Sequence, residues 1–522
     1  MSLLNGETFR SSLVLLLYLF SALVVYNIVY RVHRWNKLRH IPGPLLAGWT
    51  SLWLTNRYVK WKIFEDMKAL SDKYGPIVRI APDKVIISDV ETIYRITSAR
   101  SNYKKSDWYV VGRVMPGADN LLSMRDPELR KKRLKHVLPA YQGRGLEDFE
   151  SGIDKALQNF LHLIDTKYLS TKEEFKAMNL AQKAHFYTLD SFGEIAYSQS
   201  FGSLDQDKDV WGIVRAGDNT FPMLSAVNNH HELFQVLSKW PFYYLMPREG
   251  DKVGLGAMLG HATHLVNQRL SKLSGKEVDD VPSRDMLQSF IDHGLAGEEL
   301  KSEVAMSLKQ MLTTRNSFVG SDTVASAIRI TMLLLMTHPN AYRRLQDEID
   351  AAAEAGRISR PVLSSEANAH LPFLQAVIRE SLRLFPPSSV MPFPKEVPMG
   401  GDTVCGKFLP AGTLVCTGSV MWSVNHDETF WGRDADLFRP ERWLEADAEK
   451  VVAMNKCVDL IFGSGKFVCV GRQIGFMQMN KVLPELLRRY NWSLPDPCKL
   501  PRIDNPTVWD VHDLSVKVEK RR

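Results

Sequence analysis

The sequence predicts one large, mainly α-helical domain with a small β part, which follows a single transmembrane helix. Residues 11–30 contain no charged side chain, and residues 145–340 place apolar side chains at helical spacing with few breaks. Short strand-like segments occur near residues 77–89 and in the last quarter of the chain. The 522 residues include 45% hydrophobic and 24% charged residues, and the net charge of +7 is too mild to indicate a nucleic-acid-binding protein.

The amino-terminal apolar run predicts a membrane anchor. Its 20 residues would rise about 30 Å as a helix, which matches the hydrocarbon thickness of a bilayer. A cleaved signal peptide is the alternative, but the run is long for one and no small-x-small cleavage site precedes the next cations. By the positive-inside rule, four cations place the following side in the cytosol: Arg31, Arg34, Lys37 and Arg39.

Four parts are therefore expected along the chain. The hinge between anchor and domain contains "HIPGPLLAG", in which Pro42 and Pro44 resist both helix and sheet. We expect this hinge to be a stiff, extended linker that lifts the domain off the membrane. The expected bounds are a lumenal tail at 1–10, the anchor at 11–30, the basic and Pro/Gly-rich hinge at 31–48 and the domain at 49–522.

Within the domain, elements are predicted in chain order from periodicity and stop signals. Residues 61–75 have helical spacing and end at Gly75, and the two segments 77–82 and 84–89 predict strands. The later elements expected are a long helix from Gly297 to Thr337 before Pro339, a helix over 371–385 before two prolines, a short strand over 413–420 and a final helix from 472.

The cysteines predict a reducing compartment. The chain has five of them, an odd number, and all lie beyond residue 400. A disulfide scaffold would spread and pair its cysteines. There is no Cys-x-x-Cys pair in the sequence, which disfavours a structural zinc site.

The turn "FGSGKFVCVG" (462–471) holds Cys469 at the start of the final helix. A cysteine in that place has its thiolate stabilised by the helix dipole and by free amide donors. The surrounding glycines permit close approach of the backbone to a flat ligand. The arrangement suits a thiolate that binds a metal, such as haem iron. A buried structural cysteine is the alternative, and the turn alone does not decide between them.

Polar residues at two helical positions are further candidates. Asp322 and Thr323 in "FVGSDTVAS" could relay protons beside a haem, although a polar helix face is the alternative. Glu380 and Arg383 share a helix face and would ordinarily form a solvated ion pair. Arg442 in "FRPERW" could join them in a buried cluster that acts as a structural lock.

Together and in this order, the motifs resemble those of the cytochrome P-450 family of haem-thiolate monooxygenases, along essentially the whole chain. "FGSGKFVCVG" resembles the haem-binding loop Phe-x-x-Gly-x-Arg-x-Cys-x-Gly. The resemblance implies that Cys469 is the axial ligand of the iron of haem b, and that Phe462 and Gly465 shape the loop around the haem. The family's fold is one large, mainly α catalytic domain.

The other motifs extend the resemblance. "VGSDT" is similar to the oxygen-activation motif, which implies proton management by Asp322 and Thr323. "ESLR" matches the family's Glu-x-x-Arg pair, and Arg442 its third partner. The anchor and "IPGP" resemble those of microsomal members. "RHIPGPLLAG" and "YGPIVRIAP" look most like fungal members that tailor secondary metabolites.

The resemblance implies insertion of one oxygen atom from O₂ into an apolar small molecule by hydroxylation, epoxidation or multistep oxidation. Electrons would come through NADPH-cytochrome P-450 reductase, which carries the flavins, with cytochrome b5 as a further donor. The protein would be a single-pass protein of the endoplasmic reticulum membrane with a cytosolic catalytic domain. Two alternatives stay open: a haem-thiolate isomerase or dehydratase that does not use O₂, and a membrane protein that kept the fold and lost the haem.

Three positions depart from the family pattern. Val319 stands where Ala or Gly is usual, and Phe467 and Lys395 stand where arginines commonly meet the haem propionates. We expect Phe467 to pack on the porphyrin edge and Lys395 to carry the charged contact. In "RKKRLK" (130–135) we expect Arg133 to be a further cation for the haem. Substrate contacts are expected in three segments: 107–122, 388–393 and 508–509.

Overall fold

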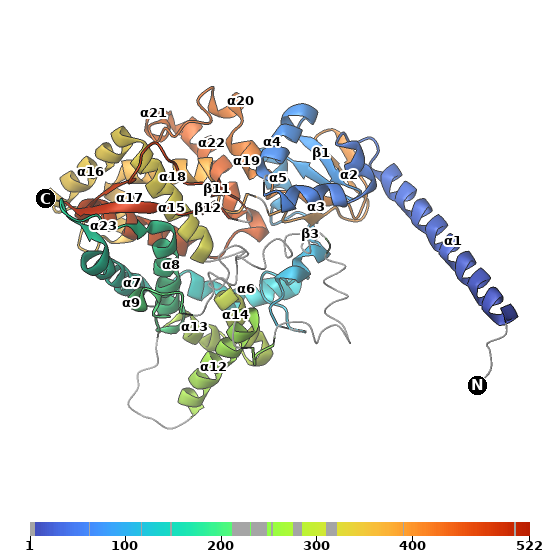
Figure 1. Cartoon of the computed structure of the whole chain (residues 1–522), viewed down its shortest axis with the longest axis horizontal. Coiled ribbons are helices and arrows are strands. Elements are labelled where there is room, and N and C mark those ends of the chain that lie inside the picture. Colours follow the sequence, from blue (N-terminus) through green and yellow to red (C-terminus); the bar gives the residue numbers. More distant parts are fainter. Residues whose placement is uncertain are drawn as a thin grey trace.

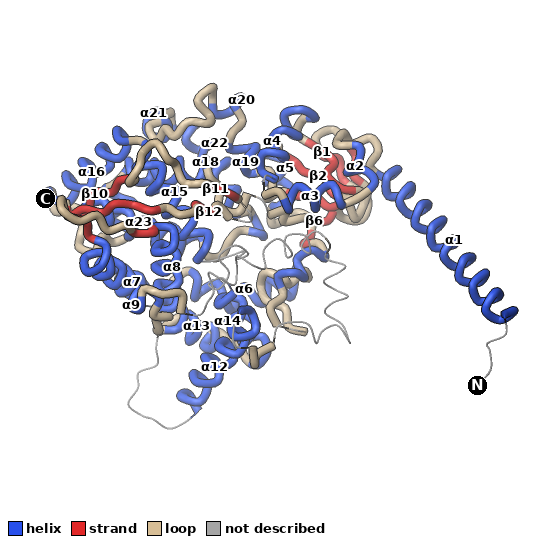
Figure 2. Tube along the Cα trace, in the orientation of Figure 1, coloured by secondary structure: helices blue, strands red, loops and turns tan. Residues whose placement is uncertain are grey.

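The computed structural model shows a broad helical body from which one long helix projects (Figure 1). The carboxyl terminus lies at the end of the body opposite to that helix. Helices dominate, and the strands gather mainly in two places, next to the long helix and near the carboxyl terminus (Figure 2). The residues that the structure describes are 6–61, 63–115, 117–146, 149–210, 230, 248–251, 254–274, 284–309, 321–389, 391–505 and 508–521.

The projecting helix is α1 (Gly6–Lys37). Its segment Ser12–Lys37 is the one helix among the described residues that is long and apolar enough to cross a membrane, and its most apolar stretch is not buried in the body. The helix is longer than the expected anchor at 11–30 because it continues through the basic residues that follow the apolar run. The expectation of one apolar amino-terminal helix that suits a membrane anchor is confirmed.

The expectation of an extended linker at 31–48 is wrong. Leu38 and Ile41 are buried, and α2 (Leu45–Trp49) begins directly after Pro44. The backbone N–H of Arg79 donates to the carbonyl oxygen of Pro42 at 2.7 Å. The buried Arg79 guanidinium also donates to three carbonyl oxygens of this segment, those of Arg34, Trp35 and Gly48. A buried guanidinium needs such acceptors, so the segment lies against the domain instead of standing clear of it.

The amino-terminal part of the domain contains the first sheet. The predicted helix α4 (Ile63–Tyr74) ends at Gly75, which has a φ of +91°, and the two predicted strands follow it. The five-stranded sheet has the order β1-β2-β9-β6-β3, in which β9 lies parallel to β2 and joins distant parts of the chain. Its members and neighbours are α3 (Leu52–Val59), β1 (Ile77–Ala81), β2 (Lys84–Ile87), α5 (Val90–Thr97), β3 (Lys104–Lys105), β6 (Lys395–Glu396) and β9 (Leu414–Cys416).

The helical core is built around α15 (Ser321–Thr337), which packs against α8, α16, α18 and α23. Its carboxyl-terminal half buries mainly apolar side chains, whereas Asp322 and Arg329 are buried with polar partners. The other helices of this part are α6 (Pro127–Tyr141), α7 (Phe149–Leu163), α8 (Leu180–Tyr197), α9 (Ser203–Gln206), α12 (Gly254–Ser274), α13 (Met286–Asp292), α14 (Gly297–Lys309), α16 (Pro339–Glu354), α17 (Ser364–His370), α18 (Pro372–Leu384) and α23 (Arg472–Arg489).

The two ends of the helix predicted from Gly297 to Thr337 are present in the structure as α14 and α15. α14 begins at Gly297 and α15 ends at Thr337, as expected from the flanking Gly and Pro signals. Residues 310–320, and Val319 with them, lie outside the described residues. The predicted helices at 371–385 and from 472 correspond to α18 and α23.

A second sheet closes the carboxyl-terminal end of the body. Its strand β13 pairs with β10, β4 and β5. Among the described residues, β13 is the last strand in the sequence. The remaining elements are β4 (Leu169–Ser170), β5 (Met178–Asn179), β7 (Asp402–Val404), β8 (Lys407–Leu409), α19 (Met421–Asn425), α20 (Glu428–Trp431), α21 (Arg442–Glu445), α22 (Ala448–Asp459), β10 (Tyr490–Ser493), β11 (Ile503–Asp504), β12 (Asp510–Val511) and β13 (Ser515–Lys520).

Candidate active site

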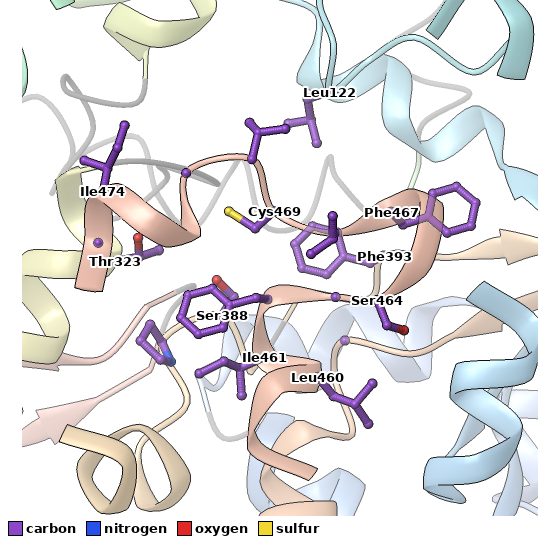
Figure 3. A pocket seen from close by; sticks show the side chains of 18 of the residues that line it. Leu122, Thr323, Ser388, Phe393, Leu460, Ile461, Ser464, Phe467, Cys469 and Ile474 are labelled. Carbon is purple, nitrogen blue, oxygen red and sulfur yellow. The ribbon is translucent and has the colours of Figure 1, made fainter. Parts of the chain in front are cut away.

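Cys469 lies in a closed turn just before α23. Two 3-10 turns precede it, η4 (Leu460–Phe462) and η5 (Gly465–Phe467). The backbone N–H of Cys469 donates to the carbonyl oxygen of Phe462 at 2.7 Å, and this hydrogen bond closes the loop. The side chain of Cys469 is partly exposed, and it lines a cavity, as Figure 3 shows. The structure therefore presents this sulfur to a space that a ligand can fill.

Gly465 is required by the packing of this turn. Its φ is +55°, and a Cβ atom there would lie 2.2 Å from the carbonyl oxygen of Thr97. The Thr97 hydroxyl also forms a hydrogen bond with the hydroxyl of Ser464. These contacts hold the loop against the end of α5, so the position of Cys469 is tied to the first sheet as well as to α23.

The environment of the Cys469 thiol differs from the sequence expectation. Burial raises the pKa of the thiol, while hydrogen bonds from the backbone amides of Gly471 and Arg472 and the charge of Arg472 oppose the rise. The helix start was expected to favour the thiolate, but in the apolar cavity burial outweighs the amides. A coordinating metal cation deprotonates a thiol outright, and the two amides then stabilise the ligated sulfur.

The cavity is lined mainly by apolar side chains. Residues from α5, the segment after β3, α14, α15, α18 and the loop before α23 contribute to it. Figure 3 shows Leu122, Thr323, Phe393 and Cys469 among the side chains that face it. Among the described residues, its charged lining side chains are three cations and one acid: Lys105, Arg130, Lys395 and Glu303.

None of the three cations forms a side-chain ion pair within the described part of the chain. The Lys105 ammonium donates to the carbonyl oxygens of Leu121 and Leu122, at 3.1 and 2.6 Å. One guanidinium nitrogen of Arg130 donates to the carbonyl oxygen of Lys466 at 2.6 Å. The buried Nε of Arg130 has no hydrogen-bond partner among the described residues. Each cation is thus held by neutral oxygens, with donor capacity left over.

Lys395 is fully buried beside Phe467. Its ammonium donates to the Tyr109 hydroxyl and to the carbonyl oxygen of Phe393, each at 2.7 Å. The same nitrogen lies 4.6 Å from the centre of the Phe467 ring and 5.2 Å from that of Tyr109. The two residues expected to replace the family's arginines therefore touch each other through a cation–π contact.

The register of the sheet brings two of the cations together. Lys105 on β3 is directly opposite Lys395 on β6 in an antiparallel pair. Like charges in that position ordinarily destabilise a sheet. Burial lowers the pKa of Lys105 and Arg130, and it lowers that of Lys395 to about 7. An anionic ligand in the cavity would offset this cost.

The residues fit a haem. A haem is flat and mostly apolar, carries two anionic propionates and accepts a thiolate on its iron. The cavity supplies apolar walls, the Cys469 sulfur and buried cations whose donors are not all used, including the orphaned Nε of Arg130. A single group with both an anionic edge and a metal centre satisfies these features together.

Arg133 does not take the position expected of it. Its guanidinium forms ion pairs with Glu299 and Glu303 on α14, each at 2.8 Å, and Arg133 is not among the residues that line the cavity. Arg130, one helical turn earlier on α6, lines it instead. Residues three apart share a helix face, so periodicity alone could not choose between these two arginines. Lys105 was missed altogether because its position depends on the pairing of β3 with β6.

Asp322 and Thr323 face different surroundings on α15. Thr323 lines the cavity that Cys469 also lines, whereas Asp322 is absent from that lining. Asp322 is buried and lies against α8, where its Oδ1 is 2.7 Å from Nδ1 of His185. Burial raises the pKa of Asp322, and the neighbouring His185 and Arg329 oppose the rise. The acid and the alcohol are thus adjacent in sequence but are oriented by different partners.

Glu380, Arg383 and Arg442 meet in a buried cluster. Arg383 donates two hydrogen bonds to Glu380, at 2.9 and 2.8 Å, and Arg442 Nε donates to the same carboxylate at 2.9 Å. The indole N–H of Trp443 and the backbone N–H of Arg439 also donate to the Glu380 carboxylate, at 3.0 and 3.1 Å. The geometry implied by the sequence motif is therefore present, with every side chain of the triad buried.

Two of the three segments expected to contact substrate do reach the cavity. Tyr109, Leu121 and Leu122 come from the first segment, and Ser388 and Phe393 from the second. The third segment does not line the cavity. Its Trp509 is buried in an aromatic cluster formed with Phe64, Phe385 and Trp422.

Comparison with known proteins identifies the family. The family model described as "Cytochrome P450" matches residues 41–518. The chain is 36% identical over 466 residues to "Cytochrome P450 monooxygenase aba1" of Botryotinia fuckeliana, with 88% of each chain covered. It is 34% identical over 507 residues to "Cytochrome P450 monooxygenase ABA1" of Pyricularia oryzae, with 95% of each covered. A relative from Leptosphaeria maculans, "Cytochrome P450 monooxygenase abl1", is 32% identical over 92% of this chain and 82% of its own.

These matches span the anchor-proximal segment, both sheets and the cysteine loop, and they agree with the fold. The family's cofactor is haem b held by a cysteine thiolate, with electrons supplied by a redox partner. The alternative of an isomerase that does not use O₂ is not favoured, because the relatives are named monooxygenases. This chain belongs to the Cytochrome P450 family and is a haem-thiolate monooxygenase.

Proposed function

We propose that Cys469 is the axial ligand of the haem iron and that Lys105, Arg130 and Lys395 hold the haem propionates. The observation that carries this assignment is the shared cavity, which the sulfur and all three cations line. Phe462 and Gly465 shape the loop, and Phe467 covers Lys395. Bound in this way, the haem supplies the iron at which O₂ is activated. Arg133 takes no direct part, because Glu299 and Glu303 occupy its guanidinium.

Around the haem, other residues of the chain have distinct roles in this proposal. Thr323 presents its hydroxyl to the cavity, and Asp322 behind it exchanges protons with that hydroxyl. Glu380, Arg383 and Arg442 fix the fold beneath the cysteine loop. The apolar lining orients the substrate and excludes water from the reacting atoms.

The proposed substrate is an apolar small molecule, and the proposed role is the tailoring of a fungal secondary metabolite. The mostly apolar lining, with Leu121, Leu122 and Phe393 from the two substrate segments, supports the substrate class. The resemblance of the hinge and first strand to fungal tailoring members supports the role, as do the fungal sources of the relatives.

The proposed location is the endoplasmic reticulum membrane, with α1 as a single span and residues 38–522 on the cytosolic side. The apolar α1 and the cations at its carboxyl-terminal end support this orientation. The proposed electron donors are NADPH-cytochrome P-450 reductase and cytochrome b5. Lys466 and Arg472, three residues before and after Cys469, are the cations proposed to meet an acidic partner, which would compete with Asp459 for Arg472.

One experiment tests the cofactor assignment. The reduced, carbon-monoxide-treated full-length protein should show the absorption band that is specific to a thiolate ligand. Cys469→Ser should abolish that band and all turnover with reductase and NADPH, because a neutral hydroxyl neither donates comparable charge nor binds ferric iron as well. Cys457→Ser, at a buried cysteine on α22 that does not line the cavity, is the control and should retain the band. A normal band in Cys469→Ser would refute the assignment.

A further inference from the structure

Asp322 forms a buried pair with a histidine that the oxygen-activation motif does not contain. His185 lies on α8, which packs along α15, and its Nδ1 is 2.7 Å from Oδ1 of Asp322. The two side chains are only 3% and 1% exposed. Two lone pairs cannot face each other at that distance in a dry site, so one proton lies between these atoms.

The remaining polar atoms of the pair are open. Asp322 Oδ2 and His185 Nε2 are both buried, and neither has a hydrogen-bond partner among the described residues. A purely structural pair in a core would ordinarily have its remaining polar atoms satisfied as well, because an unpaired buried oxygen is costly. The open oxygen belongs to the residue directly before Thr323, which lines the cavity.

Three charged or titratable groups face Asp322 from the elements packed around it. They are His185 from α8, Arg329 from α15 itself and Asp510 from β12. Arg329 is already engaged: its guanidinium donates to the carbonyl oxygen of Trp509 at 2.7 Å and lies 3.5 Å from Asp510. His185 is therefore the group that holds the Asp322 carboxyl directly.

We propose that His185 is a positioning residue for proton delivery. By its hydrogen bond to Oδ1, it fixes the plane of the Asp322 carboxyl and keeps Oδ2 available to carry the proton that passes to the Thr323 hydroxyl. This proposal rests on the proposed roles of Asp322 and Thr323. The overall reaction consumes two protons and two electrons for each O₂ and releases one water with the oxygenated product. The proton that leaves Oδ2 is replaced from solvent, and His185 keeps its own ring proton.

Two variants of similar size separate positioning from packing. In His185→Asn the amide can donate from the place of Nδ1, whereas in His185→Gln it reaches the place of Nε2. We expect His185→Gln to lower the product formed per NADPH consumed several-fold, with more hydrogen peroxide and a larger solvent isotope effect. His185→Asn should stay near the unmodified protein. Tyr187→Phe is the matched control, because Tyr187 lies on the same helix and its hydroxyl has no hydrogen-bond partner among the described residues.

The haem content and the carbon-monoxide spectrum should be unchanged in all three variants, because none of these residues lines the cavity. A double variant supplies the second readout. If His185 acts through Asp322, then His185→Gln combined with Asp322→Asn should uncouple the enzyme no further than Asp322→Asn alone.

Three results would overturn the proposal: equal coupling in the Asn and Gln variants, an unchanged isotope effect in His185→Gln, or losses that multiply in the double variant. Failure of the proposed function would look different. In that case the unmodified protein would lack the thiolate-specific carbon-monoxide band, or Asp322→Asn alone would leave coupling intact.

Discussion

Phe467 and Lys395 show how two substitutions can share one task. From the sequence alone, we expect Phe467 to supply packing and Lys395 to supply charge as separate functions. In the structure the ammonium of Lys395 lies against the Phe467 ring, which shields the ammonium from water. The ammonium is oriented by its hydrogen bonds to the Tyr109 hydroxyl and to the carbonyl oxygen of Phe393. The ring therefore holds the cation in place, and haem retention should depend strongly on that single lysine.

Lys395→Ala is expected to lower the haem content of the purified protein and to speed haem loss in mild denaturant. The variant leaves one propionate without its cation and a cavity beside Phe467. Lys395→Arg should retain haem, and Phe467→Arg should be tolerated or should tighten it. The ratio of haem to protein, measured spectroscopically, checks this. Full haem occupancy in Lys395→Ala would show that Lys105 and Arg130 suffice.

Lys395 also gives haem binding a predictable dependence on pH. Burial lowers the Lys395 pKa to about 7 in the folded chain, below its ordinary value in the unfolded chain. Above pH 7 the unfolded chain therefore binds more protons, and the haem-free protein should become more stable as the pH rises toward the ordinary lysine pKa. A bound propionate favours the charged ammonium, so haem binding takes up a proton in the same range.

Haem affinity should consequently fall as the pH rises above 7. The rate of haem transfer to an acceptor protein at pH 7 and pH 9 measures this effect. Lys395→Arg is the control, because arginine stays charged throughout and should flatten the dependence. An equally steep dependence in Lys395→Arg would assign the proton to another group.

Thr323→Ala should leave haem bound and uncouple the cycle. Without its hydroxyl the cavity would lose a positioned proton donor, and electrons from NADPH would then leave as hydrogen peroxide instead of forming product. The quantity to measure is NADPH consumed per product formed. If that ratio is unchanged, the hydroxyl has no part in proton delivery and another group supplies the protons.

At the scale of elements, α18 is attached to the rest of the domain by its buried charge cluster. Arg383 reaches the carbonyl oxygens of Asn425 and Ala435 at 2.7 and 2.6 Å, while Glu380 receives Arg442 from α21. Both oxygens of the Glu380 carboxylate accept hydrogen bonds, and the cluster joins α18 to α19 and α21 and to the segment between them. A buried charge that loses its partner is far more costly than a surface one.

Arg442→Ala should destabilise the folded protein by about 3–5 kcal/mol, because it removes one partner of a fully buried carboxylate. Arg439→Ala is the matched control on the same loop. Its side chain is 45% exposed and pairs with Asp434 and Glu445, so it should cost about 0–1 kcal/mol. Urea unfolding of the haem-loaded proteins measures both, and equal losses would contradict the role of the cluster.

Elements whose structure is determined by neighbouring residues could be predicted from the sequence, whereas elements that depend on distant partners could not. α4 and α18 carry their own periodicity and their own stop signals, Gly75 and Pro386, so they were expected nearly as they occur. The Cys469 loop is likewise a continuous motif. The strands β4 and β5 have two residues each, and they form because β13, some 340 residues later, pairs with them. The local sequence therefore contains no pattern that predicts them.

The site residues divide in the same way, into those that lie in local motifs and those that distant contacts bring together. The cysteine, the acid–alcohol pair and the Glu–Arg–Arg cluster lie in recognisable motifs, and these residues were named from sequence. Lys105 and His185 were not, because a sheet register and a helix–helix contact place them. The sequence could not distinguish Arg133 from Arg130, because residues three apart share a helix face, and the contacts with α14 show that Arg133 is the paired one.

At the scale of the whole molecule, α1 projects from the body, and only its carboxyl-terminal end, including Arg34 and Trp35, contacts the described part of the domain (Figure 1). Removal of residues 1–30 should therefore leave a domain that folds and binds haem. Carbon-monoxide spectra and sedimentation with membranes check the two parts of this prediction. Some membrane association should persist through the exposed Leu45, Leu46 and Leu52, which lie close to the new amino terminus at residue 31.

Removal of residues 1–48 is the contrasting truncation. It deletes Leu38, Ile41 and all of α2 except Trp49, and it removes three carbonyl acceptors of the buried Arg79. We expect this longer deletion to lose stability and haem, whereas the shorter one does not. Equal behaviour of the two would restore the interpretation of residues 31–48 as a free linker.

The place of β9 between β2 and β6 has a consequence for how this protein is made. β2 leaves the ribosome early, but its partner β9 begins 327 residues later. At about 5–20 residues per second, the edge of β2 waits roughly 16–65 s for that partner. During this time the nascent chain exposes an unpaired edge of a strand with three apolar residues of four, Val85, Ile86 and Ile87, held at the membrane surface by α1. The sheet, and the cysteine loop that packs on it, can be completed only when nearly the entire chain has been synthesised, so haem capture is a late event in the life of each molecule.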